Sequence, residues 1–260
     1  MLGLGISLLK GAVKPLVYIK DSLKLFFNFT NNSPDLLSDG STSFGGDDYI
    51  SLGTSSSLDI NAFTISTWVK FNSVSEGVIF GGYTDDSNYS ILRVVSGQVY
   101  SYGFTGGDDW QSITSSAVVT TGQWYHIAVT CGTDTSTPII YIDGVAVGLT
   151  SLLSSSIGTA QRLGHGTSYL GQWGHPGLPR YLNAKLSNFG IWDRQLSASE
   201  IESIRWRGAY SELKDTELTN LVSWYNLQGD VLDSVGSNNG TNNGATLNSN
   251  SYSGESPFKP

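Results

Sequence analysis

Two segments bring a tryptophan together with charged side chains, and these residues are the best suited to chemistry. The segment GGDDWQS (106–112) carries Trp110 directly after two acids, and LGQWGHPGLPRY (170–181) is rich in ring and cationic side chains. Aromatic rings stack on the apolar C–H patch of a sugar, while nearby polar groups bond its hydroxyls. The same residue types dominate contacts between subunits. We therefore predict a surface for a sugar or for a partner at Asp108, Asp109, Trp110, Trp173, His175, Arg180 and Tyr181.

The usual nucleophile arrangements are missing from the sequence. There is no G-x-S-x-G motif, and Cys131, the only cysteine, has no activating partner nearby in sequence. His126 lies in a strand-like run and is interpreted as structural, while His165 and His175 lack metal-ligand spacing. The sequence predicts neither a catalytic triad nor a zinc site.

Composition narrows the function classes further. The chain has 260 residues, a net charge of −8 and 31 glycines. This acidity argues against nucleic acid, whose phosphates require clustered Lys and Arg. A single cysteine forbids an intrachain disulfide and mildly favours folding in a reducing compartment.

The elements that would position these residues are mostly strands. Phe63, Ile65, Val69 and Phe71 alternate onto one face of a strand over residues 63–71. Residues 89–104 and 139–147 each predict a hairpin, and Asp-Gly in the second supplies the positive φ angles of a type I′ turn.

One helix is expected after residue 197. Ser197 and Glu200 form a capping box, and the helix should cover the edge of the strands. We interpret four tryptophans as core residues and a fifth, Trp206, as a packing contact; the four are Trp68, Trp124, Trp192 and Trp224.

Four segments in order resemble the laminin-G-like jelly rolls of the concanavalin A-like lectin and glucanase superfamily. They are FGGDDYISLG, TGQWYHIAVT, YIDGVAVG and LSNFGIWDRQLSASEI. The resemblance implies an all-β, two-sheet antiparallel jelly-roll sandwich with one short edge helix, over residues 35–208. Across the family it implies adhesion, glycan binding or purely structural roles.

The resemblance also raises hydrolysis and calcium binding. Hydrolytic relatives resemble one another in an E-x-D-x-x-E strand, which supplies the paired carboxylates of glycoside hydrolysis. No glutamate here stands in that pattern, so the sequence predicts no enzyme. Many relatives hold Ca²⁺ at the sandwich rim, which makes Asp47, Asp48, Asp85 and Asp86 candidate ligands; the alternative is that they are solvated loop acids.

Residues 209–260 form a C-terminal extension that departs from the family order. NLVSWYNLQGD (220–230) resembles the segment that normally begins such a domain. We expect the strand 220–228 to complete the sandwich within the same chain, since the two ends of a domain commonly lie close together. Pairing with a neighbouring molecule is the alternative.

Residues 1–34 are interpreted as an N-terminal anchoring arm. The arm combines apolar side chains with four lysines but has no long apolar stretch, so no transmembrane span is expected. This architecture resembles structural proteins of tailed bacteriophages. It predicts a virion display protein, present in many copies, whose arm docks on other virion proteins and whose sandwich touches host-surface glycans. The alternative is an extracellular or cell-surface lectin. The anchoring side chains would be Leu2, Leu4, Ile6, Leu8, Leu9, Phe26 and Phe27.

Overall fold

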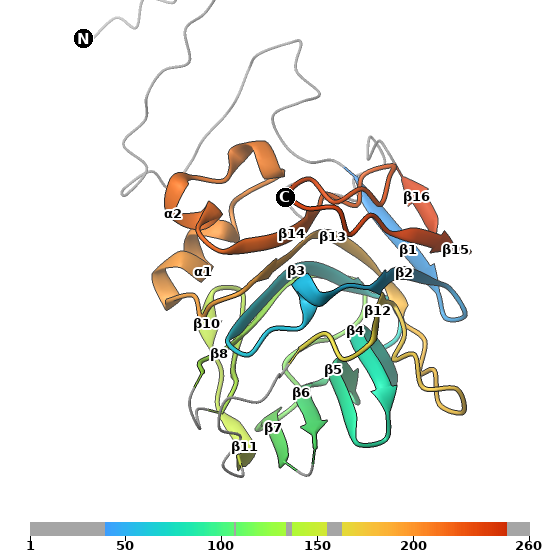
Figure 1. Cartoon of the computed structure of the whole chain (residues 1–260), viewed down its shortest axis with the longest axis vertical. Coiled ribbons are helices and arrows are strands. Elements are labelled where there is room, and N and C mark those ends of the chain that lie inside the picture. The colour runs from blue at the N-terminus through green and yellow to red at the C-terminus, as the bar shows by residue number, and fades with distance from the viewer. Residues whose placement is uncertain (1–39, 107, 134–136, 155–162, 249–260) are drawn as a thin grey trace, which may run out of the picture. The chain divides into compact units, whose positions relative to one another are not determined.

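A computed structural model describes residues 40–106, 108–133, 137–154 and 163–248. Two antiparallel sheets stack face to face in this part of the chain (Figure 1). Sheet A runs from edge to edge through β10 (Val145–Ala146), β9 (Ile139–Ile142), β8 (Trp124–Cys131), β3 (Phe63–Phe71), β13 (Asn183–Trp192), β1 (Ser41–Gly45) and β16 (Thr246–Asn248), with β14 (Leu221–Tyr225) also paired to β13. Sheet B runs through β11 (Leu149–Ser154), β7 (Asp108–Thr114), β6 (Gln98–Thr105), β5 (Asn88–Val95), β4 (Glu76–Asp85), β12 (Thr167–Leu170), β2 (Tyr49–Thr54) and β15 (Thr241–Asn243). The predicted all-β sandwich is confirmed.

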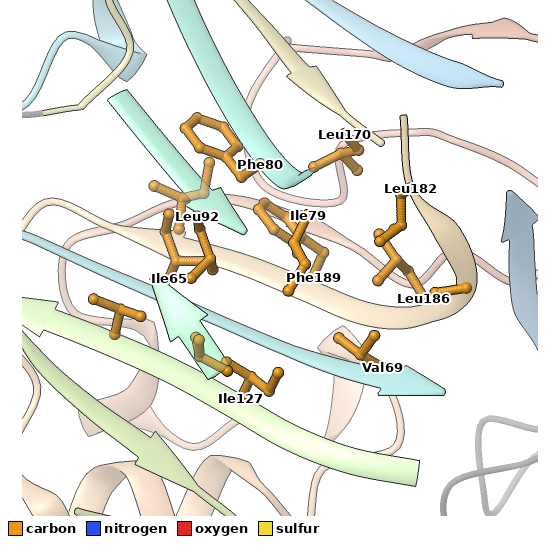
Figure 2. Packing of buried hydrophobic residues seen from close by; sticks show 14 of the residues in the cluster. Ile65, Val69, Ile79, Phe80, Leu92, Ile127, Leu170, Leu182, Leu186 and Phe189 are labelled. Atoms are coloured by element: carbon orange, nitrogen blue, oxygen red, sulfur yellow. The ribbon is translucent and has the colours of Figure 1, made fainter. Parts of the chain in front are cut away.

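The main core fills the space between the two sheets. Successive strand residues point to opposite faces, so every second side chain enters this space. The predicted inward face of β3 is confirmed, because Phe63, Ile65, Val69 and Phe71 are each 0–1% exposed. They meet Phe80 and Leu92 of sheet B and residues of β8 and β13 (Figure 2).

Both predicted hairpins form. β5 and β6 pair around Ser96 and Gly97, and β9 pairs with β10 around Asp143 and Gly144. Asp143 and Gly144 have φ values of 51° and 81°, as a type I′ turn requires. The Asp143 carboxylate also accepts a hydrogen bond from the backbone N–H of His126, which ties the turn to β8.

Short helices cover the outer face of sheet A. They are α1 (Ala198–Ile204), α2 (Asp215–Leu218) and the 3-10 turn η3 (Tyr210–Glu212); a further 3-10 turn, η2 (Ser56–Leu58), follows β2. The predicted capping box of Ser197 and Glu200 starts α1. Ile201 and Ile204 pack against Trp192 and Trp224, so α1 lies over the sheet face as well as next to the edge strand β10.

A buried ion pair joins these helices. Arg207, 6% exposed, holds both carboxylate oxygens of Glu217, 2% exposed, with distances of 2.7 and 2.9 Å. Burial acts to raise the pKa of Glu217, but hydrogen bonds from Arg207, Ser203 and the Lys214 N–H lower it overall. Trp206, predicted to be a packing contact, is 57% exposed; the Arg205 guanidinium lies over its ring, and its indole N–H donates to Glu202.

The C-terminal residues are part of the sandwich. β14 pairs with β13 of the same chain, and β15 and β16 add an edge strand to each sheet. Trp224, Tyr225 and Leu227 are 0–1% exposed. The folded unit therefore continues past residue 208, and β14 adds to sheet A within the same chain.

The arm residues 1–34, with their seven proposed anchoring side chains, lie outside the described residues. In the part that is described, none of the helices has the length and apolar character needed to cross a bilayer.

Candidate functional site

The outer face of sheet B, turned away from the core, collects aromatic side chains. Along β5, Ser90, Leu92 and Val94 are buried, while Tyr89 and Arg93 alternate onto the outer face. Tyr100, Tyr102 and Phe104 of β6 lie beside them in register, opposite Arg93, Ile91 and Tyr89 respectively. All three β6 rings are partly exposed. We call Tyr89, Tyr100, Tyr102 and Phe104 the aromatic row.

The segment 171–182 lies over the outer face at β4. A Cβ added at Gly81 of β4 would stand 2.5 Å from the Gln172 carbonyl oxygen and 2.6 Å from the Trp173 Cα. Only a glycine therefore allows the backbone of this segment, which we call the covering loop, to approach so closely. A hydrogen bond from the Val78 N–H to the Arg180 carbonyl ties the loop to β4, and one from the Trp173 N–H to the Pro179 carbonyl closes the loop on itself.

Trp173 anchors the covering loop rather than presenting its ring to solvent. It is 8% exposed and packs against Val78 and Ile91. His175 stacks on its indole with ring centroids 4.8 Å apart, and the Arg180 guanidinium lies 5.3 Å from the ring centroid. His175 and Arg180, two of its neighbours in the predicted set, therefore gather around a largely buried ring, and the binding role of this set stays a prediction.

Trp110 faces the main core between the sheets. The segment 106–112 supplies most of β7, and the alternation of that strand turns Trp110 inward against Phe63, with ring centroids 5.7 Å apart. With 1% exposure it is removed from the predicted binding set. The backbone of Asp108 and Asp109 begins β7, and their side chains lie outside the described residues.

The remaining predicted residues, His175 and Tyr181, belong to the covering loop. His175 Nε2 is 3.2 Å from an Asp86 oxygen, and Asp86 also accepts a hydrogen bond from Tyr83. Tyr181 stacks with Tyr49, with centroids 6.3 Å apart, at the β2 side of the loop.

Charged groups border the aromatic row. The guanidinium of Arg93 lies 5.2 Å from the Tyr100 ring and 5.1 Å from the Tyr102 ring, and it contacts Glu76 at 2.8 Å. Arg180 contacts the same Glu76 oxygen at 3.2 Å. Burial raises the pKa of Tyr102 to about 12, so its hydroxyl keeps its proton and remains a donor at neutral pH.

The candidate calcium ligands have other partners. Asp48 accepts the Gly45 N–H at 2.6 Å, and Asp85 accepts the Ser87 N–H and the Asn88 amide. Among the described side chains, no group of three His, Cys, Asp or Glu residues is arranged to hold a metal ion. Calcium binding at Asp47, Asp48, Asp85 and Asp86 stays a prediction.

The family comparison agrees with this architecture. Residues 44–202, more than half of the chain, match the concanavalin A-like lectin/glucanases superfamily. The chain belongs to that superfamily. No curated protein matches its sequence.

Solved structures share the fold at low sequence identity. A Bacteroides ovatus protein provisionally assigned to carbohydrate binding has 20% identity and a TM-score of 0.59 over 81% of this chain and 60% of its own. A heptameric pentraxin from Limulus polyphemus has 19% identity and a TM-score of 0.51, covering 65% and 82%. The NanB sialidase of Streptococcus pneumoniae has 16% identity and a TM-score of 0.52, covering 64% and 27%. At these identities the likeness is one of fold.

The aromatic row, Arg93 and Glu76 were not among the residues predicted from the sequence. The signal was present in QVYSYGF (98–104), where three rings recur at every second position of a predicted hairpin strand. Aromatic side chains at every second position of a strand share one face, and when the other face of the strand is buried they indicate an apolar outer surface.

Proposed function

We propose that this protein is a non-catalytic, lectin-like module that binds carbohydrate on the outer face of sheet B. The observation that carries the proposal is the partly exposed aromatic row, bordered by Arg93, Glu76 and the covering loop. Sugar rings stack on such aromatic surfaces, and the neighbouring charged and hydroxyl groups select among hydroxyl patterns.

The partners of the carboxylates support a binding role. Glu200 caps α1 and pairs with Arg194 at 2.7 Å, and this hydrogen bonding lowers its pKa to about 2. Glu217 is held by Arg207, and Glu202 lies against Arg205. A general acid for glycoside hydrolysis requires a raised pKa next to a second carboxylate. These glutamates serve structural contacts instead.

The proposal is tested by glycan binding to variants of the aromatic row. Replacing Tyr100 or Phe104 with alanine should weaken binding about fivefold each, since one lost stacking contact is worth about 1 kcal/mol. Isothermal titration against sugars first identified on a glycan array provides the measurement. Trp206→Ala removes an exposed ring beside α1 and serves as the matched control, with unchanged affinity expected. Equal affinities of the wild type and all three alanine variants would exclude the aromatic row as the sugar-binding surface.

We further propose that residues 1–34 anchor many copies of the module to a larger assembly, with a virion as the favoured setting. The support is the sequence of the arm, which alternates apolar side chains with four lysines. Repeated copies would convert weak single-site binding into useful avidity. A free extracellular or cell-surface lectin is the alternative.

Deleting residues 1–34 tests the anchoring role. We expect the truncated protein to keep its glycan affinity and its thermal unfolding midpoint but to sediment as free protein instead of with the particle. Particle association that is unaffected by the deletion would favour the free lectin.

A further inference from the structure

We infer that Arg93 and Arg180 form a subsite for the carboxylate of an acidic sugar, and that Glu76 occupies this subsite in the free protein. The inference rests on the proposed carbohydrate-binding function of the outer face and narrows its ligand to sugars that carry a carboxylate.

Two cations converge on one carboxylate oxygen. Glu76 begins β4, Arg93 lies on the adjacent strand β5, and Arg180 comes from the covering loop. The Glu76 Oε1 atom is 2.8 Å from Arg93 Nη1 and 3.2 Å from Arg180 Nη1. The two guanidinium groups and the single carboxylate therefore leave a net positive charge on the cluster. On the other side of Trp173, His175 Nε2 lies 3.2 Å from an Asp86 carboxylate oxygen.

The aromatic rings orient both guanidinium groups before a ligand arrives. Arg93 lies over Tyr100 and Tyr102, and Arg180 lies over Trp173. Arg stacks on aromatic faces while its N–H fork stays free for a carboxylate. Because the rings already restrict these two side chains, the side chains lose less conformational entropy when a ligand binds.

Glu76 is the most accessible member of the cluster. Its side chain is 46% exposed, against 15% for Arg93 and 24% for Arg180. A carboxylate from solvent reaches the guanidinium groups where Glu76 now lies, and Glu76 is exposed enough to rotate into water. A neutral sugar offers no replacement for the charged contact, so the exchange favours acidic sugars.

The backbone at Arg180 supports a specific role for its side chain. Arg180 has a φ of 51°, a left-handed conformation that is uncommon for long side chains and costs free energy. Glycine or asparagine would adopt it more easily. The presence of arginine there is explained if its guanidinium is needed beside Glu76 and Trp173.

The test compares acidic sugars with their neutral counterparts. Oligogalacturonides, hyaluronan oligomers and sialyllactose, each paired with its carboxyl-reduced form, are titrated into the full chain. For the wild type we expect tighter binding of the carboxylated form. Glu76→Gln should raise that preference by about tenfold, because the competing internal carboxylate is gone and the charge-assisted contact with the ligand remains. Arg180→Gln should abolish the preference while neutral sugars still bind.

Glu202→Gln is the matched control. Glu202 is 49% exposed and contacts Arg205 beside Trp206, so a Glu–Arg–Trp grouping like that of Glu76 occurs here away from sheet B. The Glu202→Gln variant should prefer acidic over neutral sugars to the same extent as the wild type. If Glu76→Gln weakens neutral and acidic sugars equally, Glu76 only positions the covering loop and the inference is overturned. If the wild type binds acidic and neutral sugars equally well, the carboxylate subsite is overturned, while sugar binding by the aromatic row is not. If the wild type binds no sugar at all, the proposed carbohydrate-binding function is itself overturned.

Discussion

Two buried histidines show how single residues depend on the fold around them. His126 of β8 is 1% exposed, and its Nε2 lies 2.8 Å from the Ser66 hydroxyl. Burial, assisted by the positive charge of Arg205, lowers the pKa of His126 to about 3. Burial also lowers the pKa of His165 to about 4, although Asp85 opposes this. The prediction that His126 is structural agrees with its burial and its partner.

From the lowered pKa values of these two histidines we expect the free energy of unfolding to depend on pH. An unfolded histidine takes up a proton near pH 6.5. Between about pH 6.5 and pH 4 the unfolded chain therefore holds more protons than the folded one, and the free energy of unfolding should fall as the pH is lowered through this range. Each unit of pKa difference corresponds to about 1.4 kcal/mol.

Urea denaturation of the wild type and of His126→Gln across this pH range measures the effect. Glutamine keeps a hydrogen-bonding side chain for Ser66 but cannot gain a charge, so the variant should lose part of the slope. A slope that is the same in both proteins would contradict the assignment to His126.

At the scale of elements, the covering loop depends on the strand beneath it. Its sequence predicts an aromatic, cationic segment. Its placement depends on Gly81, where the backbone of the loop lies against the backbone of β4. Trp173, His175 and Arg180 could be predicted together because they are neighbours in the chain. The burial of Trp173 could not be predicted, because it depends on which strand the loop covers.

Gly81→Ala should displace the covering loop. The added methyl group would stand 2.5 Å from a backbone oxygen, so the loop must shift. We expect a loss of about 1–3 kcal/mol in stability and a clear loss of glycan affinity. Gly177→Ala, in the same loop, meets nothing closer than 3.5 Å and is the matched control. Thermal unfolding and titration measure the two effects; unchanged glycan affinity in Gly81→Ala would show that the loop does not shape the site.

At the scale of the whole molecule, the sandwich is closed by residues from both ends of the described chain. The family match ends at residue 202, yet β15 and β16 pair with β2 and β1, and β14 pairs with β13. Trp224, Tyr225 and Leu227 fill the cores on both sides of sheet A.

Ending the chain at residue 208 should therefore abolish cooperative folding. Truncating one buried aromatic side chain costs about 3–5 kcal/mol, and a domain is stable by only about 5–15 kcal/mol. Removing two such rings together with three strands exceeds that margin. Circular dichroism during heating should show no cooperative transition, whereas a chain that ends at residue 248 should unfold like the wild type. A cooperative transition in the shorter chain would show that β14 to β16 are accessory.

The sequence by itself determined the strand over residues 63–71, both hairpins and the capped helix, because alternation, turn chemistry and capping act between residues that are close in the chain. The superfamily was indicated by the resemblance of four segments in order. Only the tertiary structure decided which face of each strand became the core. That choice turned Trp110 inward and left the aromatic row, Arg93 and Glu76 together on the opposite face, where the covering loop packs Trp173 against Val78 and Ile91. The physical reason is that alternation defines two faces for each strand, while burial depends on the sheet, helix or loop that packs against each face.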